Sequence, residues 1–268
     1  MPKTSGDPAA LVVPCFPCRT GSPTERLDTV APCVVPGLVE HVPFNILLIT
    51  IDSLRADHLG CYGYGRDTSP NLDALAGQGT LLTRMFAPAV PTQPSFTTIY
   101  TGQYSLTHGI ISHGGTEQLG PDHPFVTEEL RKAGLVTCAV DNLYSMRPWF
   151  ARGYEFYIDP SHRAKMRLSV TCEGINRRAI PCLRAHADEP FFLLVHYWDT
   201  HTPYEPPARL RHRYYDGDPT GDEYSTLEPM RTAPLGDIWR EQWLTPLSRK
   251  RWRGREIRDA EYVVALYD

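Results

Sequence analysis

A short apolar run that ends in an acidic residue constrains the fold of this chain more than any other feature. Residues Asn45–Ile51 are rich in β-branched side chains and lead directly into Asp52. A run this short and this apolar is typical of a strand buried on both faces, as in a parallel sheet covered by helices. Further strands are predicted by similar runs at Thr80–Phe86, Leu135–Val140 and Phe191–Tyr197.

Helical segments lie between these runs. Ser69–Ala76 has a serine at the N-cap and a proline at the first helical position, which is a common helix start. Three more helices are predicted at Pro94–Tyr100 before Gly102, at Thr127–Ala133 before Gly134, and at Ser169–Ala187 with a break at Pro181. Strands that alternate with helices indicate an α/β fold with a mainly parallel sheet and helices on both faces.

The two ends of the chain differ from this alternating centre. The first 43 residues hold eight of the 25 prolines and show no steady hydrophobic period, so they predict a disordered extension. Residues 205–256 are rich in Arg, Asp, Tyr and Pro, and they predict a surface excursion. The pattern turns helical at Arg258–Asp268 and the chain stops inside it. We therefore expect residues 44–268 to be the N-terminal part of a domain that is truncated at its C-terminal end.

Composition excludes several functional classes. A chain of 268 residues with 41% hydrophobic and 22% charged residues suits a globular domain, and its net charge of −4 argues against a nucleic-acid partner. No apolar run approaches the roughly 18 residues that span a bilayer, and the N-terminus lacks the order of a secretory signal. We expect a cytoplasmic protein without a membrane partner. Seven cysteines, with one lone Cys15-x-x-Cys18 pair, predict free thiols.

Three polar residues stand where an open α/β sheet places its ligand site, beyond the carboxyl ends of the strands. Asp52 ends the first strand, Thr92 precedes the helix predicted at Pro94, and His201 follows the last strand. A carboxylate at a strand end suits a hard divalent cation. A hydroxyl just before a helix faces free backbone N–H groups and a positive dipole end, which favours attack on an anionic ester.

Each of these residues also has a plainer interpretation. Asp52 could cap the following turn, Thr92 could belong to an ST-turn, and His201 could be an exposed loop histidine. Ser95 is a second candidate nucleophile, but its place one turn into the helix favours capping or packing. Packing also explains His196, which lies inside the last predicted strand.

Three strings resemble segments of the sulfatase family, which belongs to the alkaline phosphatase superfamily. The family's opening resembles Ile49-Thr-Ile-Asp-Ser-Leu-Arg-Ala-Asp-His-Leu-Gly-Cys-Tyr-Gly63 and the following Thr68-Ser-Pro-Asn-Leu-Asp-Ala-Leu-Ala76. Its nucleophile segment is similar to Pro91-Thr-Gln-Pro-Ser-Phe-Thr-Thr-Ile-Tyr-Thr-Gly102, and its histidine loop is similar to His196-Tyr-Trp-Asp-Thr-His-Thr-Pro-Tyr204. Three matches in order over residues 45–204 imply an alkaline-phosphatase-like α/β fold.

The resemblance implies a role for each matched position. Asp52 matches a metal ligand, and His201 matches the histidine that touches the ester oxygen and helps protonate the leaving group. Ser53 stands where many members have a second aspartate, and Phe96 replaces the motif arginine. Thr92 takes the place of the Cys or Ser that is oxidised to formylglycine. Because threonine is a secondary alcohol, it cannot become an aldehyde, and we expect no formylglycine.

The function implied is a metal-dependent hydrolase of a small anionic ester, with Ca²⁺, Mn²⁺ or Zn²⁺ held by Asp52 and Thr92. Superfamily members with an unmodified threonine, among them phosphodiesterases, activate the hydroxyl by metal coordination. A Thr–phosphate can be attacked by an activated water, whereas a Thr–sulfate lacks the elimination that is open to an aldehyde hydrate. The chemistry therefore favours phosphate or phosphonate esters, although the strings resemble sulfatases.

The rival hypothesis is a catalytically inactive truncated fragment, or a binding protein of the same fold. The family's Asp-His or Asp-Asn metal pair lies on a later strand, which these 268 residues do not include. Asp52 and Thr92 alone would give the cation two protein ligands, whereas catalytic sites usually supply three or more. We therefore expect little hydrolysis by this chain and activity in a version extended through the missing half.

Overall fold

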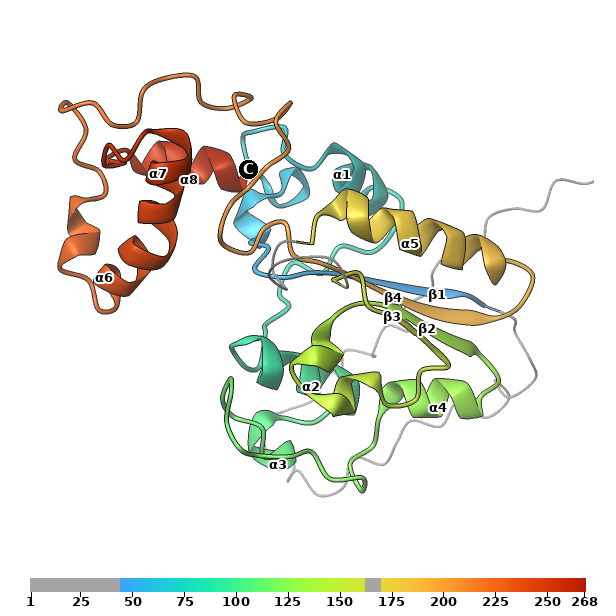
Figure 1. The fold of residues 1–268 in the computed structure, drawn as a ribbon. Coiled ribbons are helices and arrows are strands. Elements are labelled where there is room, and N and C mark those ends of the chain that lie inside the picture. The colour runs from blue at the N-terminus through green and yellow to red at the C-terminus, as the bar shows by residue number, and fades with distance from the viewer. Residues whose placement is uncertain (1–43, 162–169) are drawn as a thin grey trace, which may run out of the picture.

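The computed structural model of the chain describes residues 44–161 and 170–268. Four parallel strands form one sheet in the order β1-β4-β2-β3 (Figure 1). The strands are β1 (Ile46–Ile51), β2 (Val136–Val140), β3 (Phe156–Ile158) and β4 (Phe191–Tyr197). The predicted parallel α/β fold is confirmed. The disordered extension was predicted for residues 1–43, which lie outside the described residues.

Helices cover both faces of the sheet, as predicted (Figure 1). Within the described residues the α-helices are α1 (Pro70–Ala76), α2 (Thr92–Thr101), α3 (Ser105–His108), α4 (Val126–Lys132), α5 (Cys172–Ala185), α6 (Gly236–Trp239), α7 (Thr245–Arg251) and α8 (Ala260–Tyr267). Shorter turns of 3₁₀-helix lie at Ala56–His58, Gly60–Tyr62, Leu143–Ser145, Pro148–Ala151 and Glu228–Arg231, and a π-helical turn lies at Arg240–Leu244.

The central strand β4 shows why its sequence is an unbroken apolar run. Phe192 and Leu194 pack into the cluster that includes residues of α2, while Leu193 and Val195 pack into the cluster under α5. Side chains of a strand alternate between the two faces, so a strand with helices on both sides needs apolar residues at every position. The prediction for Phe191–Tyr197 is confirmed in position and in burial.

The prediction for β1 is correct in position but wrong in burial. Leu47 and Ile49 are 47% and 46% exposed, whereas Ile46 and Leu48 pack against the core. The strand lies at the edge of the sheet and pairs with β4 alone. Since α5 packs over β2 and β4, the face of β1 that carries Leu47 and Ile49 stays open within the described residues.

Two further predictions are wrong. Thr80–Phe86 forms no strand, and its Met85 and Phe86 side chains are largely exposed, so this run is not a buried element of the sheet. The helix predicted to break at Pro181 runs through it, because α5 is continuous from Cys172 to Ala185. The start predicted for this helix, Ser169, lies outside the described residues.

The C-terminal region is more ordered than its composition predicts. Residues 205–256 contain α6 and α7, and these pack with α8 around a third apolar cluster beside the sheet (Figure 1). Its buried members are Leu244, Leu247, Ile257, Tyr262, Val263 and Leu266. These apolar side chains come from short helices and loops, so they follow no single period, and the prediction of a surface excursion is wrong. No helix within residues 44–161 and 170–268 combines the length and apolar character needed to cross a bilayer.

Candidate active site

The carboxyl end of β1 and the N-terminus of α2 meet at an open cleft of about 650 Å³. The polar side chains that line this cleft are Thr50, Asp52, Ser53, Thr92, Ser95 and His201. A ligand site is expected at this edge of the sheet because the carboxyl ends of parallel strands face the same side. Asp52, Thr92 and His201, which were predicted to converge, line one cleft.

Asp52 and Thr92 are in direct contact. The Thr92 hydroxyl donates a hydrogen bond to Asp52 Oδ2 at 3.2 Å, and the Ser53 hydroxyl donates one to Asp52 Oδ1 at 2.8 Å. Ser53, at φ +59°, adopts the left-handed conformation that non-glycine residues rarely take. Many sulfatase sequences have a second aspartate at the position of Ser53. In this chain the position carries a hydroxyl, which bonds to Asp52.

Thr92 is the first residue of α2, rather than a residue before the helix. Pro91 occupies the N-cap, so the first helical turn begins at the backbone of the candidate nucleophile itself. The backbone N–H groups of a first helical turn have no partners within the helix, and they carry the positive end of the helix dipole. Because Pro91 and Pro94 have no N–H, an anionic ester placed at Thr92 would face the N–H groups of Thr92 and Gln93. Gly102 ends the helix in the left-handed conformation at φ +67°.

The backbone of Asp52 is held by the strand beside it. Its N–H donates to the Tyr197 carbonyl at 2.9 Å, and its own carbonyl accepts a hydrogen bond from the Thr200 hydroxyl at 2.6 Å. Burial alone would raise the pKa of the Asp52 carboxyl. The nearby His196 imidazole and the hydrogen bond from Ser53 outweigh burial, and they hold the pKa of Asp52 below its usual value. The carboxylate is therefore ionised and fixed in place.

A buried histidine and a second aspartate lie behind Asp52. His196 Nδ1 lies 2.8 Å from Asp141 Oδ1, while His196 Nε2 lies 3.8 Å from Asp52 Oδ2, too far for a hydrogen bond. Within the part of the chain that the structure describes, this Nε2 has no hydrogen-bond partner although it is buried. Burial lowers the pKa of His196, but the hydrogen bond to Asp141 and the attraction of Asp52 outweigh it, and the pKa lies above its usual value.

Sequence reasoning missed this second layer. The apolar run around His196 predicted a packing role for it, and no pattern singled out Asp141. Asp141 directly follows β2, in the same relation to its strand as Asp52 to β1, so the strand-end rule applied to every predicted strand would have found it. Asp141 is fully buried, and its Oδ2 accepts a hydrogen bond from the Tyr157 hydroxyl at 2.5 Å.

Phe96 occupies the position of the family's motif arginine, and the structure shows what it contacts. Its ring lies 4.7 Å from the His196 ring and 6.5 Å from the Phe150 ring, and the side chain is buried. An aromatic ring at this place covers the buried imidazole and offers no charge to the cleft. The departure from the motif is thus accommodated by the apolar core below α2.

His201 lines the cleft, and one of its ring nitrogens is already bonded. Its Nδ1 lies 2.7 Å from the Thr202 carbonyl, which can only accept, so Nδ1 carries a proton. The Trp198 indole packs edge-on against the ring at 5.7 Å between centroids. These contacts orient the imidazole and leave Nε2 as the ring atom able to contact a ligand.

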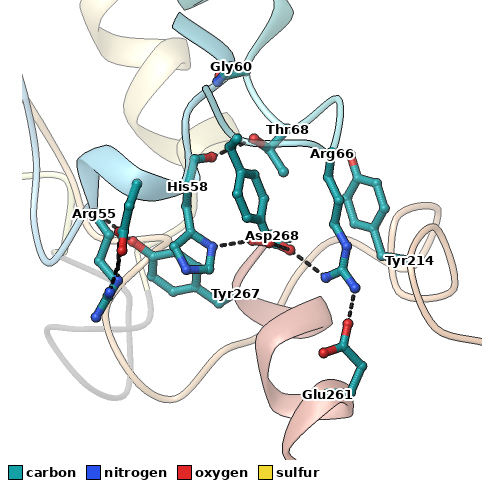
Figure 2. Close-up of polar contacts among 12 residues, drawn as sticks. Arg55, His58, Gly60, Arg66, Thr68, Tyr214, Glu261, Tyr267 and Asp268 are labelled. Carbon is teal, nitrogen blue, oxygen red and sulfur yellow. Dashed lines mark hydrogen bonds and ion pairs between the residues drawn. The ribbon is translucent and has the colours of Figure 1, made fainter. Parts of the chain in front are cut away.

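The C-terminal helix α8 holds the loop that follows Asp52 (Figure 2). The Tyr267 hydroxyl donates to the Ser53 carbonyl at 2.9 Å and accepts from the Arg55 N–H at 2.7 Å. A side chain more than 200 residues away in the sequence therefore sets the backbone beside the candidate metal ligand. No local pattern in the sequence carries this information.

Asp268, the neighbour of Tyr267, anchors the same loop (Figure 2). Its side chain is fully buried and contacts His58 Nδ1 at 2.7 Å, the Tyr64 hydroxyl at 2.7 Å and the Arg66 guanidinium at 2.6 Å. Arg66 also forms an ion pair with Glu261 of α8. These contacts close the loop between β1 and α1 onto the C-terminal helix.

The donor set of the cleft fits a hard divalent cation. Asp52 is the one carboxylate among the residues that line the cleft, and Thr92 adds a hydroxyl oxygen within hydrogen-bond distance of it. Carboxylate and hydroxyl oxygens suit Ca²⁺ and Mn²⁺, and Zn²⁺ also accepts carboxylate ligands. Two protein oxygens leave the remaining positions to water or to the oxygens of a bound ester.

Comparisons with known proteins decide the family. The family model described as Sulfatase matches residues 44–263. The chain belongs to the sulfatase family. Arylsulfatase A from Bos taurus is 33% identical over 117 residues, which are 42% of this chain and 23% of the relative. Steryl-sulfatase from Rattus norvegicus is 36% identical over 93 residues, which are 31% of this chain and 16% of the relative.

Solved structures confirm the sulfatase fold. A protein in complex with its substrate D-glucosamine-2-N,6-O-disulfate has a TM-score of 0.56 at 19% identity, and the match covers 83% of this chain and 51% of that chain. A 2-O GAG sulfatase has a TM-score of 0.54 at 16% identity, with 83% and 50% covered. This sulfatase-family chain therefore spans about half the length of these structures and less than a quarter of the curated relatives.

Proposed function

We propose that this sulfatase-family chain carries the nucleophile half of a metal-dependent ester hydrolase in which Thr92 attacks the ester. The observation that carries the proposal is the 3.2 Å contact between Thr92 Oγ1 and Asp52 Oδ2 at the N-terminus of α2. This contact places an oxygen nucleophile beside a carboxylate that can bind a cation, at the positive end of a helix. Family members and neighbours whose names refer to sulfatases support an anionic ester as the substrate class.

Asp52 and Thr92 are the residues that would hold the cation. A bound divalent cation would lower the pKa of the Thr92 hydroxyl and neutralise charge on the ester. The free hydroxyl has far too high a pKa to ionise near neutrality, so Thr92 depends on such activation. Asp52 is suited to its role because its own pKa lies below the usual value and its carboxylate stays ionised.

The backbone at the start of α2 and the His201 side chain bind and orient the ester. The N–H groups of Thr92 and Gln93 in the first turn of α2 would face the anion. Attack by Thr92 Oγ1, whose proton leaves to solvent, transfers the phosphoryl or sulfuryl group to threonine with loss of the alcohol. His201 Nε2 would deliver a proton to the departing oxygen when both ring nitrogens are protonated, because Nδ1 keeps its own proton on the Thr202 carbonyl. His196 and Asp141 support Asp52 from behind and do not reach the ester.

The threonine favours phosphate or phosphonate esters over sulfate esters. A secondary alcohol cannot become the aldehyde from which a sulfated intermediate breaks down by elimination. A phosphorylated threonine can be cleared by attack of water at phosphorus. Phe96 in place of the motif arginine also favours phosphate or phosphonate esters, because the arginine that stabilises the modified side chain in the family is absent.

The test is single-turnover labelling of Thr92. The 268-residue chain is incubated with a p-nitrophenyl phosphonate monoester or with p-nitrophenyl sulfate in the presence of Mn²⁺. Release of p-nitrophenol is followed, and the peptide that contains Thr92 is examined by mass spectrometry for the added group. We expect the phosphonyl adduct on Thr92, formed slowly and without turnover because Asp52 and Thr92 alone hold the cation, and faster labelling by the phosphonate ester than by the sulfate ester.

Matched variants separate the alternatives. Thr92→Ala is expected to lower labelling roughly 10³-fold or more, as the loss of a nucleophile does elsewhere, while Thr92→Ser retains it. Ser95→Ala, which removes the other hydroxyl of α2 that lines the cleft, is expected to leave labelling unchanged. Labelling of Ser95, or equal labelling of Thr92→Ala, would refute the proposed nucleophile. Mn²⁺ binding without any adduct would instead favour the rival hypothesis, an inactive fragment or a binding protein of the same fold.

A further inference from the structure

A second cluster of metal-ligating side chains lies outside the cleft, between β2 and α5. Cys138 is in β2 and Cys182 is in α5, and both are buried, while His186 is the C-cap of α5. One ligand atom from each residue, the two Sγ atoms and a ring nitrogen, can be chosen so that all lie within 4.8 Å of one another. The cluster plays no part in the proposed ester hydrolysis.

The local structure explains how the three residues meet. Cys182 and His186 are four residues apart at the end of α5, so they lie on the same side of the helix. Cys138 pairs in register with Leu193 of β4, whose side chain packs into the cluster under α5. Cys138 therefore projects from the sheet toward α5, and away from the face that carries α2 and Thr92.

One ring nitrogen of His186 already has a carboxylate partner. Its Nδ1 lies 2.6 Å from Glu189 Oε1, and the Phe156 ring packs against the imidazole at 5.2 Å between centroids. A carboxylate on one ring nitrogen fixes the tautomer and makes the other nitrogen, Nε2, a better donor to a metal. This is the usual arrangement of histidines that bind zinc in proteins.

We propose that Cys138, Cys182 and His186 bind a thiophilic divalent cation of the Zn²⁺ type, which ties the end of α5 to the centre of the sheet. Two thiolates and one imidazole are ligands that Zn²⁺ prefers, and water would complete a tetrahedral site. On binding, both thiols lose their protons to solvent, so one cation enters and two protons leave. The buried site then gains no net charge, which keeps a cation and two thiolates compatible with the apolar surroundings.

The four cysteines among the described residues provide an internal control. Cys138, Cys182, Cys61 and Cys172 are all free thiols, but the last two lie outside the cluster. The experiment uses the reduced 268-residue chain with Cys15, Cys18 and Cys33 replaced by Ser, so that these thiols contribute nothing to the signal. Co²⁺ is titrated in as a spectroscopic substitute for Zn²⁺, and proton release is measured in weakly buffered solution.

We expect one equivalent of Co²⁺ to produce thiolate-to-cobalt charge-transfer absorption, to release two protons, and to be displaced by Zn²⁺. The double variant Cys61→Ser, Cys172→Ser should behave like the parent. Cys182→Ser should lose the charge-transfer band. Glu189→Gln, which changes only the residue that orients His186, should weaken the apparent affinity roughly 10–100-fold.

Three results would overturn the inference. The first is the absence of charge-transfer absorption in the parent. The second is an affinity for Co²⁺ that is unchanged in both His186→Asn and Glu189→Gln. These two positions are partly exposed, so the variants keep the test valid if Cys182→Ser fails to fold. The third is formation of a Cys138–Cys182 disulfide in air from protein that takes up no metal when reduced, which would make the pair a redox couple.

Discussion

Two carboxylates on either side of the same loop, Asp52 and Asp268, have opposite surroundings. The side chain of Asp268 is fully buried and is contacted by an imidazole, a phenol and a guanidinium. Asp52 keeps 10% of its side chain exposed to the cleft and receives hydrogen bonds from two hydroxyl groups. One carboxylate is saturated by donors from its own protein, and the other is left partly available.

The difference lies in the chemistry of the donors. A guanidinium is a permanent cation that only donates, so its bond to Asp268 is charge-assisted and survives over a wide range of conditions. The hydroxyls of Ser53 and Thr92 rotate freely and can accept as well as donate. They can therefore turn their oxygens toward a cation that binds Asp52. Asp268 is thus a carboxylate that stabilises the fold, whereas Asp52 is one that can bind a ligand.

The largest effect is expected from Asp268→Ala. Removal of this carboxylate leaves the Arg66 guanidinium and the His58 ring without their shared partner. We expect a loss of stability of about 2–4 kcal/mol, below that of a fully buried pair because Arg66 is 27% exposed. The loss is measured by urea unfolding, with the exposed Asp57→Ala as the control. A change no larger than that of the control would show that Asp268 is not a structural anchor.

A smaller effect, on Mn²⁺ affinity rather than on stability, is expected from Asp52→Asn. This substitution keeps the shape of the side chain but removes the charge that attracts a cation, so Mn²⁺ affinity should fall about 10–100-fold, equivalent to about 1.4–2.7 kcal/mol. Isothermal titration with Mn²⁺ measures the affinity. Asp268→Asn, a matched loss of one carboxylate charge, should bind Mn²⁺ like the parent under conditions where it is folded. Equal losses in the two variants would erase the distinction between the two sites.

The smallest effect is expected from Tyr267→Phe, which tests the link between the two regions. The variant loses the hydroxyl that donates to the Ser53 carbonyl and accepts from the Arg55 N–H. Because water can reach these exposed backbone groups, the cost in stability should be about 0.5–1.5 kcal/mol, with a few-fold loss of Mn²⁺ affinity. Tyr62→Phe, which removes a hydroxyl bonded to the Leu82 carbonyl, is the control. Full retention of Mn²⁺ affinity in Tyr267→Phe would mean that α8 does not position Asp52.

Features that rest on local patterns were predictable from the sequence. Strand β4 was found with its correct bounds because every residue of Phe191–Tyr197 but His196 and Tyr197 is apolar and the strand is covered on both faces. The helix α2 was predicted at Pro94–Tyr100 from Pro94 and Gly102, and it begins two residues earlier, at Thr92. The strand-end rule leads to Asp52 and His201 from their positions along the chain, since it needs only the end of each strand.

Features that depend on neighbours in space were decided by the tertiary structure alone. An apolar strand such as Ile46–Ile51 looks the same in sequence at the centre of a sheet and at its edge, because pairing partners come from distant segments. His196 has the sequence context of a packing residue, and only the fold places Asp141 and Asp52 on its two sides. The sequence by itself determined the family, the parallel α/β class and the positions of β1, β2 and β4, and it placed Asp52, Thr92 and His201 near one edge of the sheet, since these depend on local motifs and periodicity. The short strand β3 was not predicted. Only the three-dimensional fold decided which carboxylate is saturated and which is open, because the donors of Asp268 lie more than 200 residues away along the chain.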